Sequence, residues 1–440
     1  MYTIPRGTPV NAELIQSVIE YKDNQVKRLT RLQNYYLGDQ DINSREKSPG
    51  LSNNKVVVNH AKYIVDINTS YLLGNPVDYQ ATEGVDIEPL RDAYKEQTIN
   101  DLDVEIAKTC GIYGKAYEYV YANEESKPKS ALIDNRNIVI VRDDSMEHNK
   151  LFAVLYRPVY NSAKQEVQYY EITIADKATI GHYKLDHNTL IELEPEQVHA
   201  FGDVPVIEYK NNAEEQGDFE NVISLIDAYN LLQSDRLNDK EQLVDAILCF
   251  TNMDFDEEDA EALRVHRVIS RIPADGKVEY LTKTLNEADT DVLRKTIEQD
   301  IHKISMVPNM SDENFIGNAS GVAIRYKLLA FEQNIQNKER SMEKGLMERF
   351  TLYNNYLSTK EAMQQVKKTE VDAVFKRNLP SNDYETSQMI MNLDGKVDTE
   401  TLIAQLSFIK DAQEIVGLAK KEKEAEPAQP TYEELMNNEE

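Results

Sequence analysis

The longest periodic stretch of the chain is GVAIRYKLLAFEQNIQNKERSMEKGLMERFTLYNNYLS, residues 321–358. Leu328, Ile335 and Met342 recur in it every seven residues, and further large apolar residues continue the stripe to Leu357. This spacing predicts one helix, which would be roughly 55 Å long at ~1.5 Å per residue. Because such a helix exceeds the span of most small domains, we expect neighbours along it, either coiled helices or sister subunits.

The sequence before this helix reads as a second helix and a polar loop. A helical pattern covers 287–305, Pro308 interrupts it, and residues 309–320 form a loop of small polar residues. Inside the long helix, Gly345 is a candidate kink. We therefore expect two helices joined by a short polar connection.

Further helical patterns surround a region rich in strands. Residues 110–210 alternate in polarity, carry many aromatic and β-branched residues and have hairpin-like polar breaks, which predicts a twisted antiparallel sheet. The other helical patterns cover residues 11–37, 61–73, 87–109, 219–250, 386–393 and 399–418. In the first of these helices, the cationic side chains predicted to face away from the apolar stripe are Lys22, Lys27, Arg28 and Arg31. The fold class predicted from these elements is α+β.

Two shorter stretches have distinct signatures. Residues 268–272 and 277–281 flank Pro273-Ala-Asp-Gly276, which is typical of a hairpin. Residues 420–440 are acidic and poor in bulky apolar residues, which predicts a disordered tail.

Composition narrows the classes of function. The chain has 440 residues, a formal charge of −28 and two cysteines, Cys110 and Cys249. No apolar run approaches the ~18–20 residues of a membrane span, and the N-terminal residues lack a signal-peptide pattern. Two cysteines in apolar surroundings exclude a disulfide framework and a cysteine-rich metal site. Because tight binding of long DNA requires many phosphate-neutralising cations, a chain this acidic makes a poor DNA clamp.

Motifs for nucleotide, metal and acyl-transfer chemistry are absent from the sequence. The nearest imitation of a phosphate-binding loop, residues 111–116 (GIYGKA), has the wrong spacing, and a tight turn into a strand accounts for it. None of the seven histidines forms H-E-x-x-H or pairs with cysteine at metal-binding spacing, and no G-x-S-x-G elbow occurs. We predict a protein that is not an enzyme and uses no metal or cofactor.

Four segments, in order along the chain, resemble the portal proteins of tailed bacteriophages, in the branch typical of long-tailed (siphophage-type) phages of Gram-positive bacteria. They are residues 53–77 (containing NNKVVVNH and YLLGNPV), 111–119 (GIYGKAYEY), 219–239 (containing SLIDAYN and SDRLND) and 311–329 (SDENFIGNASGVAIRYKLL). The resemblance extends over about residues 10–415. Each segment alone is a weak signal, but the ordered set is specific.

The resemblance implies a ring, usually of twelve copies, at one vertex of the capsid. Double-stranded DNA would pass through its central channel during packaging and again at infection. The implied parts are a wing (1–234, strand-rich at 110–210), a first stem helix (235–252), a small α/β clip (253–286), a second stem helix (287–308), a tunnel loop (309–320), a long kinked backbone helix with a return to the wing (321–380), a helical crown (381–419) and a disordered acidic tail (420–440).

The implied tunnel loop has a composition suited to a moving contact. Neutral hydrogen-bonding side chains would allow DNA to slide, while the two acidic ones would prevent tight phosphate binding. The loop residues implied to line the channel are Asn309, Ser311, Asp312, Glu313, Asn314, Phe315, Asn318 and Ser320. Without the resemblance, the same residues would read as an ordinary surface linker.

One locally basic group falls within the implied clip. Its members are Arg264, His266, Arg267, Arg271 and Lys277. These side chains would contact acidic surfaces of a docking partner or of neighbouring clips, and a solvated strand face is the alternative interpretation.

By the resemblance, the partners are the terminase, head–tail adaptor proteins, and capsid and scaffolding protein, with no membrane. Assembly would take place in the bacterial cytoplasm, and the product would be part of the virion. One alternative is a non-phage oligomeric scaffold or adaptor protein without a DNA channel. Another is a hydrolase hidden in the strand-rich region, although the turn at Gly111–Gly114 has no Ser or Cys between its glycines.

Overall fold

The computed structural model divides the chain into two compact units, Met1–Arg377 and Asn378–Glu440. The residues that the structure describes are 1–49, 51–161, 166–244, 247–252, 254, 256–266, 272–273, 275–281, 287–310, 326, 328–377, 383–393, 395–403, 405–406, 409 and 415–417. The acidic tail predicted at 420–440 lies outside them. In these residues, no helix is long and apolar enough to cross a membrane.

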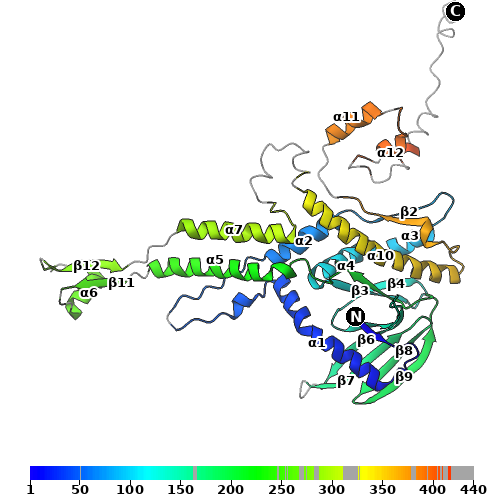
Figure 1. Cartoon of the computed structure of the whole chain (residues 1–440), viewed down its shortest axis with the longest axis horizontal. Helices are drawn as coiled ribbons and strands as arrows, with labels where there is room; N and C mark the ends of the chain where they lie inside the picture. The colour runs from blue at the N-terminus through cyan, green and yellow to red at the C-terminus, as the bar shows by residue number, and fades with distance from the viewer. Residues whose placement is uncertain are drawn as a thin grey trace, which may run out of the picture. The chain divides into compact units, whose positions relative to one another are not determined.

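The first unit contains both helices and strands, and its strands β3 to β10 follow one another in the sequence (Figure 1). Its described helices are α1 (Ala12–Leu37), α2 (His60–Leu73), α3 (Glu88–Glu96), α4 (Ile99–Tyr113), α5 (Ile223–Val244), α6 (Glu257–His266), α7 (Glu287–Ser305) and α10 (Leu329–Thr359), with the 3-10 turns η1 (Asp41–Ser44), η2 (Glu220–Val222) and η3 (Lys368–Glu370). Its described strands are β1 (Tyr2–Ile4), β2 (Asp78–Ala81), β3 (Lys115–Ala122), β4 (Pro128–Ile133), β5 (Ile138–Asp143), β6 (Lys150–Tyr160), β7 (Val167–Ala175), β8 (Thr179–Asp186), β9 (Thr189–Val198), β10 (Val206–Lys210), β11 (Ile247–Thr251), β12 (Lys277–Leu281) and β13 (Val371–Val374).

The strand-rich region forms two sheets. Strands β5 to β9 are an antiparallel meander with β1 added in parallel beside β5, giving the order β1-β5-β6-β7-β8-β9. Strands β10, β3 and β4 form a second antiparallel sheet in that order. Antiparallel pairing across this region is therefore confirmed. The six-stranded sheet has α1 on one face, and the three-stranded sheet packs against part of the other.

The position predicted for the first helix is confirmed by α1, but one of the cationic side chains predicted to face solvent is buried. Lys22 is only 5% exposed, because its side chain lies over β3 with the ammonium 5.4 Å from the centre of the Tyr117 ring. Burial lowers the pKa of Lys22 to about 8. The prediction that Lys22 faces solvent was therefore wrong, because β3 packs against a part of α1 outside its apolar stripe.

The helix predicted at 87–109 is two helices, α3 and α4. The chain changes direction between them at Thr98, whose φ of 52° is left-handed and cannot continue a helix. Helix α4 ends at Gly114, which has φ 86°, and a Cβ there would collide with the carbonyl of Glu215. The imitation of a phosphate-binding loop is thus a helix end that turns into β3, as the sequence predicted.

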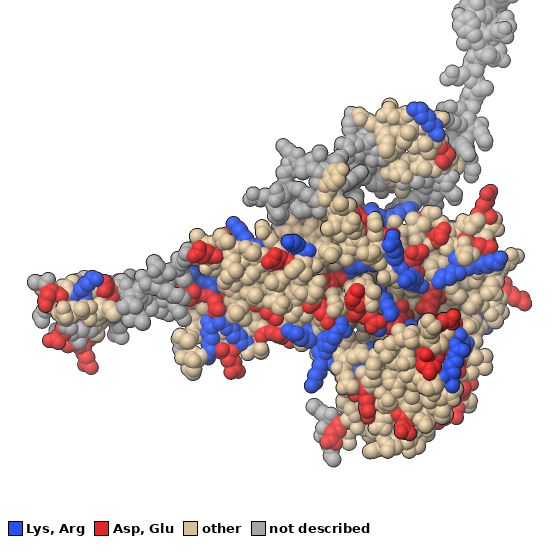
Figure 2. All heavy atoms as spheres, in the orientation of Figure 1, with Lys and Arg blue, Asp and Glu red and all other residues tan. Residues whose placement is uncertain are grey.

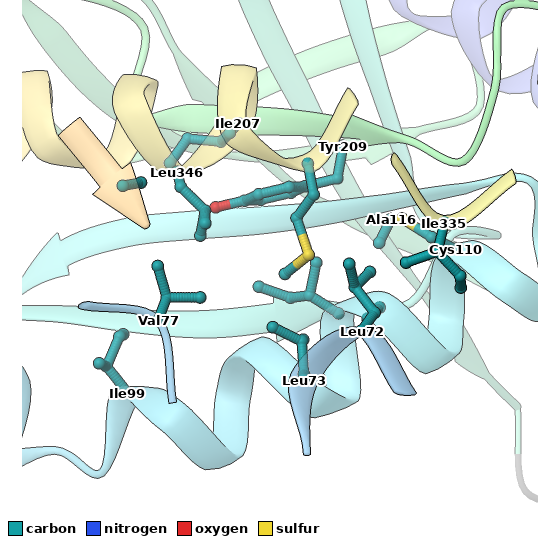
Figure 3. Packing of buried hydrophobic residues seen from close by; sticks show 14 of the residues in the cluster. Leu72, Leu73, Val77, Ile99, Cys110, Ala116, Ile207, Tyr209, Ile335 and Leu346 are labelled. Atoms are coloured by element: carbon teal, nitrogen blue, oxygen red, sulfur yellow. The ribbon is translucent and has the colours of Figure 1, made fainter. Parts of the chain in front are cut away.

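The main hydrophobic core lies between α2, α4, α10 and the three-stranded sheet (Figure 3). Leu328, Ile335 and Met342 are all buried in it, which confirms the seven-residue stripe. Helix α10 covers 31 residues, from Leu329 to Thr359, and follows a turn at Leu328, so the prediction of one helix from residue 321 was wrong at its start. A Cβ at Gly345 would overlap the Tyr209 ring, so glycine is required there for the helix to approach β10 closely.

A buried ionic network also fastens α10. Arg349 is completely buried, and its guanidinium donates to Asp103 of α4 at 2.6 Å and to Glu118 of β3 at 2.8 Å. The hydroxyl of Tyr209 donates to the same Glu118 carboxylate at 2.6 Å. Burial raises the pKa of Asp103 to about 6, although Arg349 opposes the shift.

The second unit contains two described helices, α11 (Asp383–Leu393) and α12 (Thr399–Ile403). The Thr401 amide donates to the Asp398 carboxylate at 2.8 Å, which confirms the N-terminus predicted for the second helix. The described residues 405, 406 and 409 are not helical, so the prediction of one helix from 399 to 418 was wrong. Most of the other residues up to 418 lie outside the described residues. Together the two units give a chain of mixed helix and sheet, in agreement with the coarse fold class.

Candidate functional site

The candidate site consists of the helices α5 and α7 and the residues around their ends, because the sequence implied two stem helices and a channel loop there. The two helices lie side by side, with the Arg294 guanidinium 3.4 Å from the Tyr229 hydroxyl (Figure 1). Helix α7 has the bounds predicted from its helical pattern, 287–305, and ends three residues before the implied stem helix, 287–308. Helix α5 ends at Val244, so the predicted helical continuation to residue 252 was wrong.

The residues after α5 form strand β11, which pairs antiparallel with β12 from Ile247↔Leu281 to Thr251↔Lys277. The run Ile-Leu-Cys-Phe-Thr suits a strand as well as a buried helix, and pairing with β12 decides between them. The partner predicted for 277–281 was 268–272, which lies mostly outside the described residues. The pairing that the structure describes is with 247–251 instead.

A ladder of neutral hydrogen bonds fixes an extended segment, residues 54–58, along α5. Asn230, Ser234 and Asn238 are all buried on one face of the helix. Their side-chain oxygens accept from the backbone amides of Val58, Val56 and Asn54 at 2.8, 2.9 and 2.7 Å, in that order. We call this set the α5 ladder.

The spacing of the α5 ladder follows from geometry. Four residues of α-helix rise about 6 Å, and two residues of extended chain rise about 6.6 Å, so every fourth helical residue meets every second strand residue. Both partners lie in segments that carried the family resemblance, 53–77 and 219–239. The two segments are therefore parts of a single contact.

The end of α7 is fastened to α2. Met306 has a left-handed φ of 56° directly after the helix, and the chain then passes through Pro308. The Tyr63 hydroxyl donates to the Pro308 carbonyl and accepts from the Met310 amide, both at 2.9 Å. The Asn309 side-chain amide donates to Glu298 at 3.0 Å. This region, residues 307–310 with Tyr63, is called the α7 exit below.

Two histidines pack against the α7 exit. His302 donates from Nδ1 to the Val307 carbonyl at 2.9 Å, and the centre of its ring lies 5.5 Å from that of Tyr63 and 5.8 Å from that of His60. The Nε2 atom of His60 is buried without a hydrogen-bond partner. Burial, and secondarily the nearby His302, lowers the pKa of His60 to about 4.

A second polar cluster joins the start of α5 to α4 and α10. The Asp218 carboxylate accepts from Lys338 and from Asn68 at 2.7 Å, and its backbone amide donates to the Gly111 carbonyl at 2.7 Å. A Cβ at Gly111 would lie 3.0 Å from that carboxylate. The glycine motif at 111–114 therefore serves close packing.

The predicted channel residues are placed only in part. Asn309 lies in the α7 exit with its side chain bound to α7. The seven others lie outside the described residues: Ser311, Asp312, Glu313, Asn314, Phe315, Asn318 and Ser320.

The predicted basic group of the clip is not assembled in the described residues. Lys277 is exposed on β12 and pairs with Glu279 of the same strand. Arg264 and His266 belong to α6, but their side chains are not described, and Arg267 and Arg271 lie outside the described residues. Figure 2 shows acidic and basic side chains interspersed over the visible face rather than separated into large patches of one sign.

Sequence reasoning missed the α5 ladder and Tyr63. Small neutral polar residues recur every fourth position in α5, at Asn230, Ser234 and Asn238, and this spacing signalled the ladder. Nothing in the sequence marks Tyr63 among 25 tyrosines. Within the described residues, no group of three or more His, Cys, Asp or Glu side chains is placed to hold a metal ion.

Comparison with known proteins agrees with the resemblance drawn from the four segments. The sequence profile of the family described as "Phage portal protein, SPP1 Gp6-like" matches residues 15–428. The portal protein of Bacillus phage SPP1 is 24% identical over 430 residues, which cover 91% of this chain and 84% of the relative. The portal protein of Clostridium phage phiCD119 is 21% identical over 445 residues, covering 93% and 96%. The chain thus belongs to the SPP1 Gp6-like family of phage portal proteins.

Proposed function

We propose that this chain assembles into the ring-shaped DNA conduit at one vertex of a phage capsid. The observation that carries the proposal is the family match over residues 15–428. The conduit would serve genome packaging, connection of head and tail, and DNA ejection. In this role the chain is a structural component of the virion rather than an enzyme.

The paired helices provide the natural stem of such a ring. In this assignment α5 and α7 are the stem helices, and the clip lies between them with β11, α6 and β12. The first unit up to the start of the stem is the wing, α10 is the backbone helix, and α11 and α12 belong to the crown. Compared with the parts implied by the sequence, the clip now begins about six residues earlier, because α5 ends at Val244.

Residues 309–320 are proposed to line the narrowest part of the channel. Support for this proposal comes from its first residue, Asn309, which follows the end of α7 after three residues, 306–308. Its neutral polar side chains suit DNA that must move, because each charge-assisted phosphate contact would have to break as the duplex advances. The overall charge of −28 per subunit would also weaken the binding of DNA phosphates, because it repels them.

The exposed end of the clip is proposed to dock the terminase during packaging and head–tail adaptors afterwards. Arg264, His266, Arg267, Arg271 and Lys277 would contact acidic surfaces there. Capsid and scaffolding proteins would contact the rest of the ring during assembly in the bacterial cytoplasm. Twelve subunits are expected in the virion.

Electron microscopy of the purified full chain, together with its mass in solution, tests the conduit. We expect rings with an axial hole wide enough for duplex DNA and a mass near twelve times 50.4 kDa. A small oligomer without a hole, formed even in the presence of scaffolding protein, would instead support a scaffold or adaptor protein.

Added positive charge tests the channel loop. Replacing Asn314 and Asn318 by Lys should slow or block DNA passage in a packaging assay while rings still form, because the new ammonium groups would hold phosphates. The matched control replaces Asn24 and Asn100, two exposed asparagines outside the loop, by Lys. Normal packaging by the loop variant, or an equal defect in the control, would count against the loop assignment.

A further inference from the structure

We propose that Tyr63 is a positioning residue that couples the start of the channel loop to helix α2, and through it to stem helix α5. This inference rests on the proposed function, because the coupling matters only if DNA passes the loop. Its physical basis is the α7 exit, where one hydroxyl holds two backbone groups on either side of Asn309.

The Tyr63 hydroxyl uses both of its hydrogen-bonding roles on the same short segment. It donates to the Pro308 carbonyl and accepts from the Met310 amide, each at 2.9 Å. Neither backbone group lies in a helix or strand, because the α7 helix has already ended at Ser305. The hydroxyl thus supplies contacts that regular structure does not provide, and it comes from an element more than 240 residues away in sequence.

The neighbouring contacts make this segment a unit. His302 holds the Val307 carbonyl, and Glu298 holds the Asn309 side chain, so two anchors belong to α7 itself. Tyr63 is the anchor that belongs to α2. If residues 308–310 move together with α7, the contacts made by His302 and Glu298 are therefore kept. The same movement must either displace α2 or break the Tyr63 contacts.

The path continues from α2 to α5. Asn59 caps α2, accepting from the Lys62 amide at 3.0 Å, and residues 54–58 immediately before it are held by the α5 ladder. Tyr63 lies in the first turn of α2, close to that cap. The start of the loop, α2 and α5 are consequently joined by a continuous series of hydrogen bonds, which is a physical network of the kind that carries coupling between sites.

The test compares Tyr63→Phe with a matched control, Tyr356→Phe. The first change removes the hydroxyl but keeps the ring beside His302. The control removes a hydroxyl that also donates to a backbone carbonyl, that of Ser126, at the same 2.9 Å distance. Both variants are made in the full chain, and ring mass is checked before other measurements.

Two readouts are needed, one local and one functional. Amide hydrogen exchange in assembled rings should show Met310 exchanging about tenfold faster in Tyr63→Phe and unchanged in Tyr356→Phe, since the loss of a net bond of this kind is worth about a factor of ten. In a packaging assay with terminase, the Tyr63 variant should package DNA at a several-fold lower rate, and the control at the normal rate.

The outcomes separate the coupling from the conduit itself. Unchanged Met310 exchange, or faster exchange with a normal packaging rate, would overturn the role of Tyr63 while leaving the portal function intact. An equal packaging defect in Tyr356→Phe would also overturn it, because the effect would not be specific to the α7 exit. Failure of the unmodified chain to form rings that package DNA would instead refute the proposed function.

Discussion

Two helices of the first unit, α10 and α5, are fastened to their surroundings by opposite chemistry. Helix α10 is held by a buried guanidinium, Arg349, between two buried carboxylates. Helix α5 is held by the neutral α5 ladder, whose oxygens accept from an extended backbone. Both sets of contacts are buried, so the difference lies in charge rather than in exposure.

The two arrangements respond differently to a lost contact. Removing the cation of this buried ionic network leaves uncompensated carboxylates in a medium of low polarity, at a cost of several kcal/mol. Removing one member of a neutral ladder leaves one unsatisfied amide, at a cost of about 1–3 kcal/mol. We therefore expect α10 to be fixed in an all-or-none manner, whereas α5 can adjust one bond at a time. In the proposed role of α5 as a stem helix, the second behaviour would let it adjust while DNA moves through the channel.

The largest effect is predicted for Arg349→Met. This change leaves Asp103 and Glu118 buried beside each other without a cation, and it should lower the free energy of unfolding by about 3–5 kcal/mol. Chemical denaturation at pH 7 measures this free energy. Arg340→Met, at an exposed position of the same helix, is the control and should change stability by less than about 0.5 kcal/mol. A loss at position 349 no greater than that of the control would remove the distinction between the two helices.

Next in size is an acid-sensitive contribution from His60, at the junction of α2, α5 and α7. Its folded-state pKa of about 4 lies below the ordinary value of 6.5, so the unfolded chain takes up a proton first as pH falls. The stability it contributes is complete above pH 6.5 and is lost between 6.5 and 4, by up to about 3 kcal/mol. Stability curves over this range should flatten in His60→Gln relative to the unmodified chain.

The same experiment has an internal control in His187, which lies on an exposed turn between β8 and β9. His187→Gln should retain the full loss of stability between pH 6.5 and 4. If the His60 variant loses as much stability on acidification as this control, burial of His60 is not the cause.

A smaller effect is predicted for Ser234→Ala in the α5 ladder. The Val56 amide would lose its acceptor at a buried position, which should cost about 1–2 kcal/mol. Ser224→Ala, at an exposed position of the same helix, should be close to neutral. A loss of 4 kcal/mol or more at Ser234 would show that the ladder acts as a single cooperative unit and would erase its contrast with the Arg349 network.

The sequence predicted those parts of the fold that depend on local periodicity. The buried stripe of α10, the helical spans of α1, α2 and α7 and the antiparallel strands follow from repeats of 3.6 or 2 residues, and the structure confirms them. The family was also recognisable from four segments. Two of these meet in the α5 ladder, and a third packs its glycine Gly111 against Asp218.

The remaining features depend on contacts between distant segments. Lys22 is buried because β3 covers it, and residues 247–251 are a strand because β12 pairs with them. Thr98 adopts a left-handed conformation that no residue-type preference indicates. Tyr63 acquires its position from α7, more than 240 residues later. Periodicity carries no information on such pairings.

The smallest predicted effect at neutral pH, and the most discriminating, is that of Asp103→Asn. Arg349 would keep one carboxylate, Glu118, so the network would remain charge-balanced, and the free energy of unfolding at pH 7 should change by only about 1 kcal/mol.

The pH dependence of stability should change more in Asp103→Asn than the stability at pH 7. The pKa of Asp103 is raised to about 6 in the folded chain, so its contribution is complete below about pH 4 and is lost as pH rises to 6. This slope is opposite in sign to that of His60, and it should disappear in Asp103→Asn while the His60 slope persists. If Asp103→Asn lowered the free energy of unfolding as much as Arg349→Met, the network would require both carboxylates. Its excess negative charge would then not explain why it differs from the α5 ladder.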